Sequence, residues 1–240
     1  MLKLIGFDAD DTLWHSEVYF RVAHDAFEKI LSHYLDLSNH KVHEHLLDVE
    51  RRNIKLFGYG AKGMTLSMLE TAISMTQERI SAKHLHEIIA LGKEVLLHPV
   101  ALIEGIEQAV LEVAKEYQVV LITKGDLFHQ ESKVAQSGLS NLFGRIEIEY
   151  KKNPATYQRV LSEFGLAPHQ FLMVGNSLRS DISPVLQIGG YAIHMPYAVT
   201  WALEHDEHFV PDENRMSVVD SAQCIPAAVH ALALKAARIH

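Results

Sequence analysis

The stretch Leu2-Lys-Leu-Ile-Gly-Phe7, followed by Asp8-Ala-Asp-Asp-Thr12, decides the fold class of this chain. Its apolar half has the length of a buried β-strand and stops abruptly at acidic residues. After Pro99, further apolar strands alternate with helical stretches. Strands are predicted at 118–123, 145–150, 171–174 and 191–194, and helices at 104–116, 127–137, 154–164, near 182 and at 225–237. The alternation predicts an α/β fold with a doubly wound, mostly parallel sheet and helices on both faces.

The segment between the first strand and Pro99 has a different character. Residues 16–98 carry little strand signal, and their apolar side chains recur at helical spacing. One such stripe consists of Val18, Val22, Phe27, Ile30, Leu31 and Tyr34. Ser38 and Ser81 are candidate N-caps of two further helices. We therefore expect an α/β core domain made of residues 1–15 and 99–240, interrupted by a helical domain of residues 16–98.

Composition and charge narrow the possible function classes. Of the 240 residues, 48% are apolar and 22% charged, which is typical of a soluble globular protein. The 22 Lys and Arg against 30 Asp and Glu leave a net charge of −8, which argues against a general nucleic-acid or membrane-surface binder. An anionic substrate would therefore need a local positive group. With Cys224 alone, no secretory signal and no long apolar span, a cytoplasmic protein is expected.

The 16 histidines do not follow a metal-binding pattern. His84 and His86 are two residues apart, so they point to different sides of any helix that carries them. His205 and His208 are three apart and could share a face, but no His-Glu-x-x-His pattern or cysteine partner accompanies them. Solvated histidines are the expected interpretation.

The residues that follow the predicted strands form a coherent set, because ligands bind beyond the carboxyl ends of parallel strands. The set consists of Asp8, Asp10, Thr123, Lys124, Lys151, Asn176 and Asp181. The two acids of the first strand could supply one ionised nucleophile and one group that donates and accepts a proton. The side-chain oxygens of Asn176 and Asp181 suit Mg²⁺. Thr123 and Lys151 could hold a phosphoryl group by hydrogen bond and charge.

The order of these residues resembles the four motifs of the haloacid dehalogenase (HAD) superfamily, in its phosphatase branch. The first motif, Asp-x-Asp-x-Thr after a strand, matches Asp8-Ala-Asp-Asp-Thr12. The second, a hydroxyl residue that ends a strand, matches Thr123 in Val120-Leu-Ile-Thr123. The fourth resembles Gly175-Asn-Ser-Leu-Arg-Ser-Asp181, with Asn176 in place of the usual first acid.

The third motif is a lysine that precedes a helix, and two adjacent lysines are candidates. The family pattern Lys-x-x-Pro-x-x-Tyr or Phe selects Lys151 over Lys152, through Pro154 and Tyr157. Together the four motif regions span most of the chain outside the helical segment.

The resemblance implies a phosphomonoester hydrolase that acts on a small phosphorylated metabolite. Asp8 would attack phosphorus, while Asp10 would protonate the leaving oxygen and then activate a water that hydrolyses the aspartyl phosphate. An acid at the position of Asp10 also favours phosphoryl chemistry over dehalogenation, since a departing halide needs no proton.

The resemblance further implies a cofactor and an oxyanion site. Mg²⁺ would be held by Asp8, the Asp10 carbonyl and the carboxylate of Asp181, while Asn176 would help through its amide oxygen or a bridging water. Thr123, the amide of Lys124 and Lys151 would hold the phosphoryl oxygens.

The helical segment would correspond to the C1 cap of this family, a lid that selects the leaving group. Within it, Gly58-Tyr-Gly-Ala-Lys-Gly63 formally matches Gly-x-Gly-x-x-Gly, but it follows a polar helical stretch where a dinucleotide site needs a strand. Two interpretations stay open: a plain interhelical loop, or a substrate-facing loop in which Tyr59 and Lys62 touch the leaving group.

Two other functions remain as alternatives. A phosphomutase of the same superfamily would use the same acids and return the phosphoryl group to a sugar. A receiver-like signalling module also gathers acids, a hydroxyl and a lysine around a phosphorylatable aspartate, but it requires neither the helical segment nor a second-step base such as Asp10.

Overall fold

The computed structural model describes residues 1–206 and 208–239 and contains two compact units. The first, which we call the core unit, comprises Met1–Glu17, Val100–Lys124 and Gln130–His240. The second, the helical unit, comprises Val18–Pro99 and Gly125–His129. The helical unit therefore includes a short piece that directly follows Lys124, a piece that the sequence had placed in the core domain.

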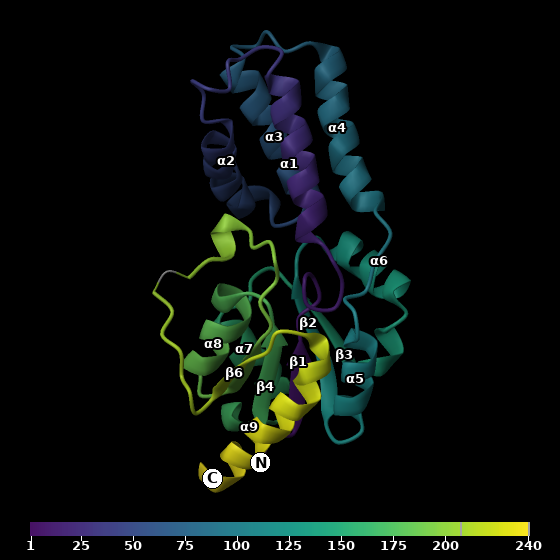
Figure 1. Ribbon diagram of the computed structural model, residues 1–240, viewed down its shortest axis with the longest axis vertical. Helices are drawn as coiled ribbons and strands as arrows, with labels where there is room; N and C mark the ends of the chain where they lie inside the picture. Colours follow the sequence, from purple (N-terminus) through teal and green to yellow (C-terminus); the bar gives the residue numbers. More distant parts are fainter. Residues whose placement is uncertain (207, 240) are drawn as a thin grey trace. The chain divides into compact units, whose positions relative to one another are not determined.

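The core unit is built on one six-stranded, all-parallel sheet with strand order β3-β2-β1-β4-β5-β6 (Figure 1). The strands are β1 Leu4–Phe7, β2 Gln118–Lys124, β3 Arg145–Glu149, β4 Phe171–Gly175, β5 Tyr191–His194 and β6 Met216–Val218. The first five coincide with the predicted strands, and the short edge strand β6 was not predicted. The predicted α/β, doubly wound fold is confirmed.

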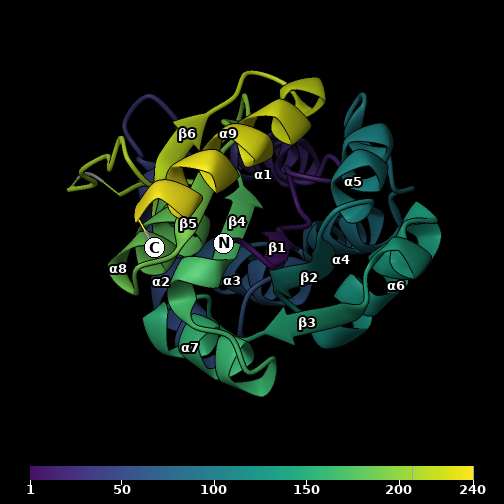
Figure 2. The ribbon, with the colours of Figure 1, turned by 90° about the horizontal axis from the view of Figure 1, so that it is seen from below.

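Helices cover both faces of this sheet, as seen from below in Figure 2. On one face lie α5 Ile106–Ala114 and α9 Ile225–Ile239, and on the other lie α7 Pro154–Glu163 and α8 Ser183–Gln187. Successive strand residues serve opposite faces, so Ile5 packs in the first apolar cluster and Leu4 in the second. Burial on both faces explains why the strands are nearly continuous apolar runs.

The central strand β1 lies between β2 and β4, and Phe7 is paired with Leu121 on one side and Val174 on the other. Strand order reverses at β1, which makes this the point where ligands bind in doubly wound sheets. Gly6 allows the close packing here, because a Cβ at this position would lie 2.8 Å from the Phe171 ring. The residues that follow β1, β2 and β4 are therefore brought to one edge of the sheet.

The helical unit contains four long helices: α1 Glu17–Leu31, α2 Val42–Phe57, α3 Ala61–Met75 and α4 Ala82–Leu97. The first residue of α1, Glu17, belongs to the core unit. Its apolar core includes Phe27, Leu31, Met68 and Ile88, all fully buried. The predicted stripe is correct at Phe27 and Leu31 but wrong at Val22, which is 64% exposed.

One of the two predicted helix caps in this unit is correct. Ser81 Oγ accepts a hydrogen bond of 3.2 Å from the His84 amide at the start of α4. Ser38 does not cap α2, because that helix begins after Lys41 without a side-chain cap. Among the helices within residues 1–206 and 208–239, none is long and apolar enough to cross a membrane.

Candidate active site

Asp8 follows β1 and presents its carboxylate at the edge of the sheet. Its amide donates to the Val174 carbonyl at 2.9 Å, which fixes the backbone. Oδ1 accepts a hydrogen bond of 2.5 Å from Lys152 Nζ, and Oδ2 lies 3.5 Å from the Thr12 hydroxyl. Burial, and secondly repulsion from Asp181, raise the pKa of Asp8 to about 7. Asp8 is therefore a buried carboxyl group whose ionisation depends on the charges of Asp181 and Lys152.

The lysine that contacts Asp8 is Lys152, and not Lys151, which the motif spacing had selected. Lys152 is buried, and its ammonium donates to Asp8 and to Asp181 Oδ1. Burial alone would lower its pKa, but the two carboxylates raise the pKa of Lys152 well above its usual range. Lys151 is exposed, with Nζ 5.7 Å from the centre of the Tyr150 ring. Adjacent residues point in different directions here, and only Lys152 points inward.

Asp181 is completely buried in the π-helical turn Leu178–Ile182. Its Oδ1 accepts from Lys152, and its Oδ2 accepts from the Ser177 amide at 2.9 Å. A Cβ on Gly175 would lie 2.4 Å from the Asp181 carboxyl carbon, so only glycine lets this carboxylate pack against the end of β4. Both oxygens of Asp181 are therefore engaged within the protein.

Asn176 has a different environment, close to the first motif. One end of its amide lies 3.2 Å from both Asp8 Oδ2 and the Asp10 carbonyl oxygen, and 3.3 Å from the Thr12 hydroxyl. With nitrogen at this end, the amide donates to both oxygens. With oxygen there, the amide oxygen lies beside the Asp8 and Asp10 oxygens, and such hard oxygen ligands suit Mg²⁺.

This geometry differs from the expectation that Asp181 is the main metal ligand of motif four. Asn176, rather than Asp181, faces Asp8 and the Asp10 carbonyl, because Asp181 is turned to Lys152 and Ser177. The candidate metal ligands are therefore one carboxylate, one backbone carbonyl and one amide. Among the described residues, no three His, Cys, Asp or Glu side chains form a metal-binding group.

The Asp10 side chain is held by three donors, none of which the sequence analysis identified. Lys133 Nζ donates to its two oxygens at 2.6 and 2.7 Å, Gln130 Nε2 to Oδ2 at 2.8 Å, and Trp14 Nε1 to Oδ1 at 2.7 Å. Burial alone would raise the pKa of Asp10, but the Lys133 charge and these bonds lower it. Asp10 is thus held as an ionised carboxylate.

The two donors from α6, Leu127–Ser137, could have been noticed from their spacing. Gln130 and Lys133 are three residues apart, so they share one face of this helix, and both are buried. Nothing in the sequence, however, indicates that this face meets the first motif.

Thr123 and Lys124 end β2, beside β1. Thr123 is 1% exposed, and Lys124 Nζ donates to Ser180 Oγ at 2.8 Å and to the Glu204 carboxylate. The Lys124 side chain is thus directed toward these two residues. Glu204 lies in a long connection without a recognisable motif, and no sequence pattern distinguishes it.

The predicted cap residues lie in the helical unit. Tyr59 is half-buried. Lys62 Nζ donates to both carboxylate oxygens of Asp126 at 2.9 Å and lies 5.7 Å from the centre of the Phe128 ring. Asp126 also accepts a 3.0 Å bond from the His129 amide, as the N-cap of α6. Lys62 is therefore tied to the segment that begins directly after Lys124.

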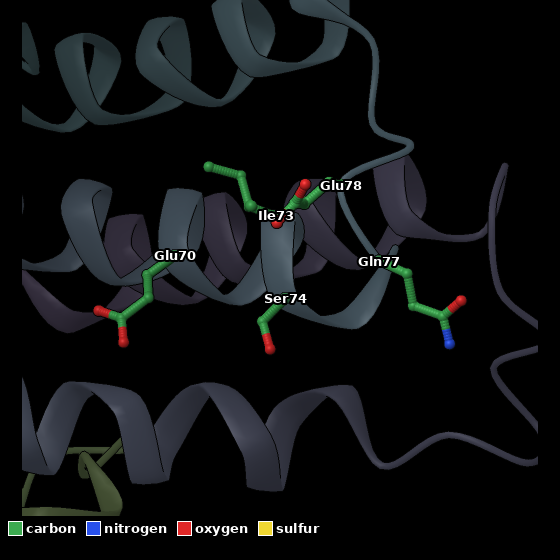
Figure 3. A pocket seen from close by; sticks show the side chains of 5 residues that line it. All are labelled: Glu70, Ile73, Ser74, Gln77 and Glu78. Atoms are coloured by element: carbon green, nitrogen blue, oxygen red, sulfur yellow. The ribbon is translucent and has the colours of Figure 1, made fainter.

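The helical unit also has an open hollow of about 690 Å³ at the end of α3 (Figure 3). It is lined by Glu70, Ile73, Ser74, Gln77 and Glu78. None of the predicted site residues lines it.

Comparison with known proteins agrees with the motifs. The model of the haloacid dehalogenase-like hydrolases matches residues 2–189, so the chain belongs to this family. The chain is 24% identical over 204 residues to a glyceraldehyde 3-phosphate phosphatase of Pyrococcus furiosus, which covers 82% of this chain and 81% of that protein. It is 27% identical over 126 residues to human N-acylneuraminate-9-phosphatase, over 50% of this chain and 51% of that protein. Family membership and these relatives support a phosphatase.

Solved structures give the same family. A haloacid dehalogenase-like family hydrolase from Xanthomonas campestris is 54% identical, with a TM-score of 0.90, and the match covers 100% of this chain and 95% of that one. The L-2-haloacid dehalogenase of Xanthobacter autotrophicus shares the fold, with a TM-score of 0.64 at 15% identity over 96% of this chain and 99% of that one. The fold therefore houses both phosphatases and dehalogenases, and the reaction has to be argued from the site.

Proposed function

We propose that the protein hydrolyses small phosphomonoesters through an aspartyl phosphate on Asp8. The observation that carries the proposal is the environment of Asp8. Its buried carboxylate accepts a hydrogen bond from Lys152 on one oxygen, and a second carboxylate, Asp10, is two residues away in the chain. A nucleophile and a separate proton carrier are what a two-step phosphoryl transfer requires.

In the first step, an Asp8 oxygen forms a bond to phosphorus while the bond from phosphorus to the leaving oxygen breaks. The leaving alkoxide takes a proton from the Asp10 carboxyl group and departs as an alcohol. For this step Asp10 has to carry a proton, which weakens its ion pair with Lys133.

In the second step, the Asp10 carboxylate removes a proton from water as the water attacks phosphorus. The bond from Asp8 to phosphorus breaks, phosphate leaves, and both aspartates return to their starting states. The pairing of Asp10 with Lys133 at 2.6 Å favours the ionised form that this step needs. Asp10 is thus better prepared as the base of the second step than as the acid of the first.

The residues around Asn176 fit a bound Mg²⁺. Asp8 Oδ2, the Asp10 carbonyl and the Asn176 amide oxygen would hold it, since the hard oxygens of the first two groups lie beside one end of the Asn176 amide. When bound, Mg²⁺ would offset the repulsion between the anionic substrate and the carboxylates.

The phosphoryl oxygens would be bound by residues of β2 and by the buried lysine. The hydroxyl of Thr123 and the backbone amide of Lys124 lie at the end of the strand next to β1, and Lys152 supplies the positive charge. This is the local positive group that a protein of net charge −8 needs for an anionic substrate.

We also propose that residues 16–98 act as a cap that selects the leaving group. Lys62 supports this, because its partner Asp126 is two residues beyond Lys124 in the chain. Lys62→Ala should then raise KM or change the substrate ranking, and an unchanged ranking would favour a plain interhelical loop for 58–63.

A panel of phosphomonoesters with Mg²⁺, including glyceraldehyde 3-phosphate, a sugar-acid phosphate and hexose phosphates, tests the function. Released phosphate is measured with and without EDTA, for the wild type and for Asp8→Asn. We expect turnover that EDTA abolishes, and none in Asp8→Asn with an unchanged circular dichroism spectrum.

Three results would contradict the proposal. Turnover by Asp8→Asn would exclude Asp8 as the nucleophile. An isomeric sugar phosphate in place of free phosphate would identify a phosphomutase. A single, slow release of phosphate without multiple turnover would identify a receiver-like module.

A further inference from the structure

Glu204 is a partly buried carboxylate that no motif of the site includes. Its side chain is 13% exposed and comes from the connection between β5 and β6. One oxygen pairs with Lys124 Nζ, while Oε2 accepts hydrogen bonds from Ser177 Oγ at 2.7 Å and Ser180 Oγ at 2.6 Å. A carboxylate with three strong donors is held in one place.

The three donors come from both sides of the strand that carries Asp8. Lys124 ends β2, and the two serines follow β4, while β1 lies between these strands. Ser177 and Ser180 are also hydrogen-bonded to each other, and Lys124 Nζ donates to Ser180 at 2.8 Å. Glu204 therefore closes a network that ties the segment after β2 to the segment after β4.

The connection that carries Glu204 is itself anchored to the same turn. Arg179 Nη1 donates to the Leu203 carbonyl at 2.8 Å, and the Glu204 amide donates to the Trp201 carbonyl at 2.9 Å. Arg179 is exposed and still makes this contact. These bonds hold the carboxylate in position against the turn.

We propose that Glu204 is a positioning residue for the phosphoryl site. It keeps Thr123 and the Lys124 backbone at a constant distance from the turn that holds Asn176 and Asp181. This inference rests on the proposed phosphatase function. It goes beyond it by assigning a role to a residue outside the four motifs.

A competing role is that of an internal plug, in which the Glu204 carboxylate takes the place of an anionic group of the substrate. The bonds favour the positioning role. All three donors belong to two segments of the protein, the end of β2 and the turn after β4, and Lys124 is paired with Glu204 while it is also held by Ser180. The two roles predict opposite changes in phosphate affinity when the charge is removed.

The test compares Glu204→Gln with Glu213→Gln, a matched exposed glutamate in the same connection. We would measure inorganic phosphate binding by calorimetry, its Ki as a product inhibitor, KM and kcat for one phosphomonoester, and thermal unfolding. For Glu204→Gln, we expect Kd and Ki for phosphate and KM to rise about tenfold. Glu213→Gln should match the wild type. Lys124→Met should reproduce the loss, and Glu204→Gln should add little to it.

The outcomes separate the alternatives. Tighter phosphate binding in Glu204→Gln would identify a plug and overturn the positioning role. Unchanged binding, or a loss fully explained by unfolding at the assay temperature, would overturn it as well. A wild type that neither binds phosphate nor hydrolyses any phosphomonoester would instead reject the proposed function.

Discussion

Lys152 donates a hydrogen bond of 2.5 Å to Asp8 Oδ1, and this ammonium is the positive charge nearest to the buried carboxylate in the described site. The same ammonium pairs with Asp181, so two buried acids share one lysine charge. Without it, two carboxylates would face each other in a site that excludes water, at a cost of several kcal/mol. The pairing therefore makes the acidic site compatible with both folding and an anionic substrate.

Lys152→Met should reduce kcat/KM for any substrate about a hundredfold or more, because the phosphoryl charge loses its buried cation. Lys151→Met is the matched control and should stay within about twofold, since Lys151 is exposed and directed over Tyr150. Steady-state kinetics of both variants, with thermal unfolding to monitor folding, measure the difference. A larger loss in Lys151→Met would restore Lys151 as the phosphate ligand.

The two lysines show which features of the site the sequence could predict. The strand ends carrying Asp8, Thr123 and Asn176 were predictable, because apolar runs ending in polar residues mark the edge of a parallel sheet. The choice between adjacent lysines depends on which side chain points inward from a loop, and spacing to a following Pro does not determine this.

The helical unit shows a similar limit. Phe27 and Leu31 were predicted correctly as core residues, but Val22 on the same stripe is exposed. Helical spacing identifies which side of a helix is apolar. Whether a given residue on that side is buried depends on whether a neighbouring helix covers it. Glu204 and Lys133 could not be predicted for a related reason. The side chain of each makes its contacts with residues 24 or more positions away in the chain.

Asn176→Asp should strengthen Mg²⁺ binding, because a carboxylate would replace the amide beside Asp8 and the Asp10 carbonyl. We expect about a tenfold lower Mg²⁺ concentration for half-maximal activity and a larger Mg²⁺-induced rise in Tm. The metal-free variant should be less stable than the wild type, because the added charge lies near Asp8. Asn176→Ala should need more Mg²⁺ than the wild type. Equal Mg²⁺ dependence in all three proteins would remove Asn176 from the metal site.

Lys133→Met should impair both folding and turnover, because Asp10 would lose its ammonium partner. Breaking a fully buried ion pair costs about 3–5 kcal/mol, and the Asp10 side chain is 28% exposed. We therefore expect a loss of about 2 kcal/mol in the free energy of unfolding. Urea titration measures it, with Glu131→Gln on the exposed side of α6 as the control. Adding Asp10→Asn should recover most of the loss, and no recovery would show that Lys133 acts through packing alone.

The Lys62–Asp126 pair allows the contribution of helix capping to stability to be measured separately from that of the ion pair. Lys62 is 52% exposed, so Lys62→Ala should cost only about 0.5 kcal/mol. Asp126→Ala also removes the N-cap of α6, a further loss of about 1 kcal/mol, whereas Asp126→Asn keeps a capping oxygen. Urea titration should rank Asp126→Ala below the other two variants in stability. Equal losses for Asp126→Ala and Asp126→Asn would mean that capping contributes nothing.

The stability contributed by Glu204 should depend on pH in one direction only. Burial alone would raise the pKa of this carboxyl group, but the Lys124 charge and the two serine hydroxyls lower it below its usual value. A lowered pKa means that the ionised group stabilises the fold above the unfolded-state pKa of about 4.3 and that this contribution is lost as pH falls through the folded-state pKa. The difference in free energy of unfolding between wild type and Glu204→Gln should therefore be constant from pH 6 to 8 and shrink steadily below about pH 4. Urea titrations across that range measure it, and a difference that persists undiminished at low pH would show that Glu204 contributes by shape rather than by charge.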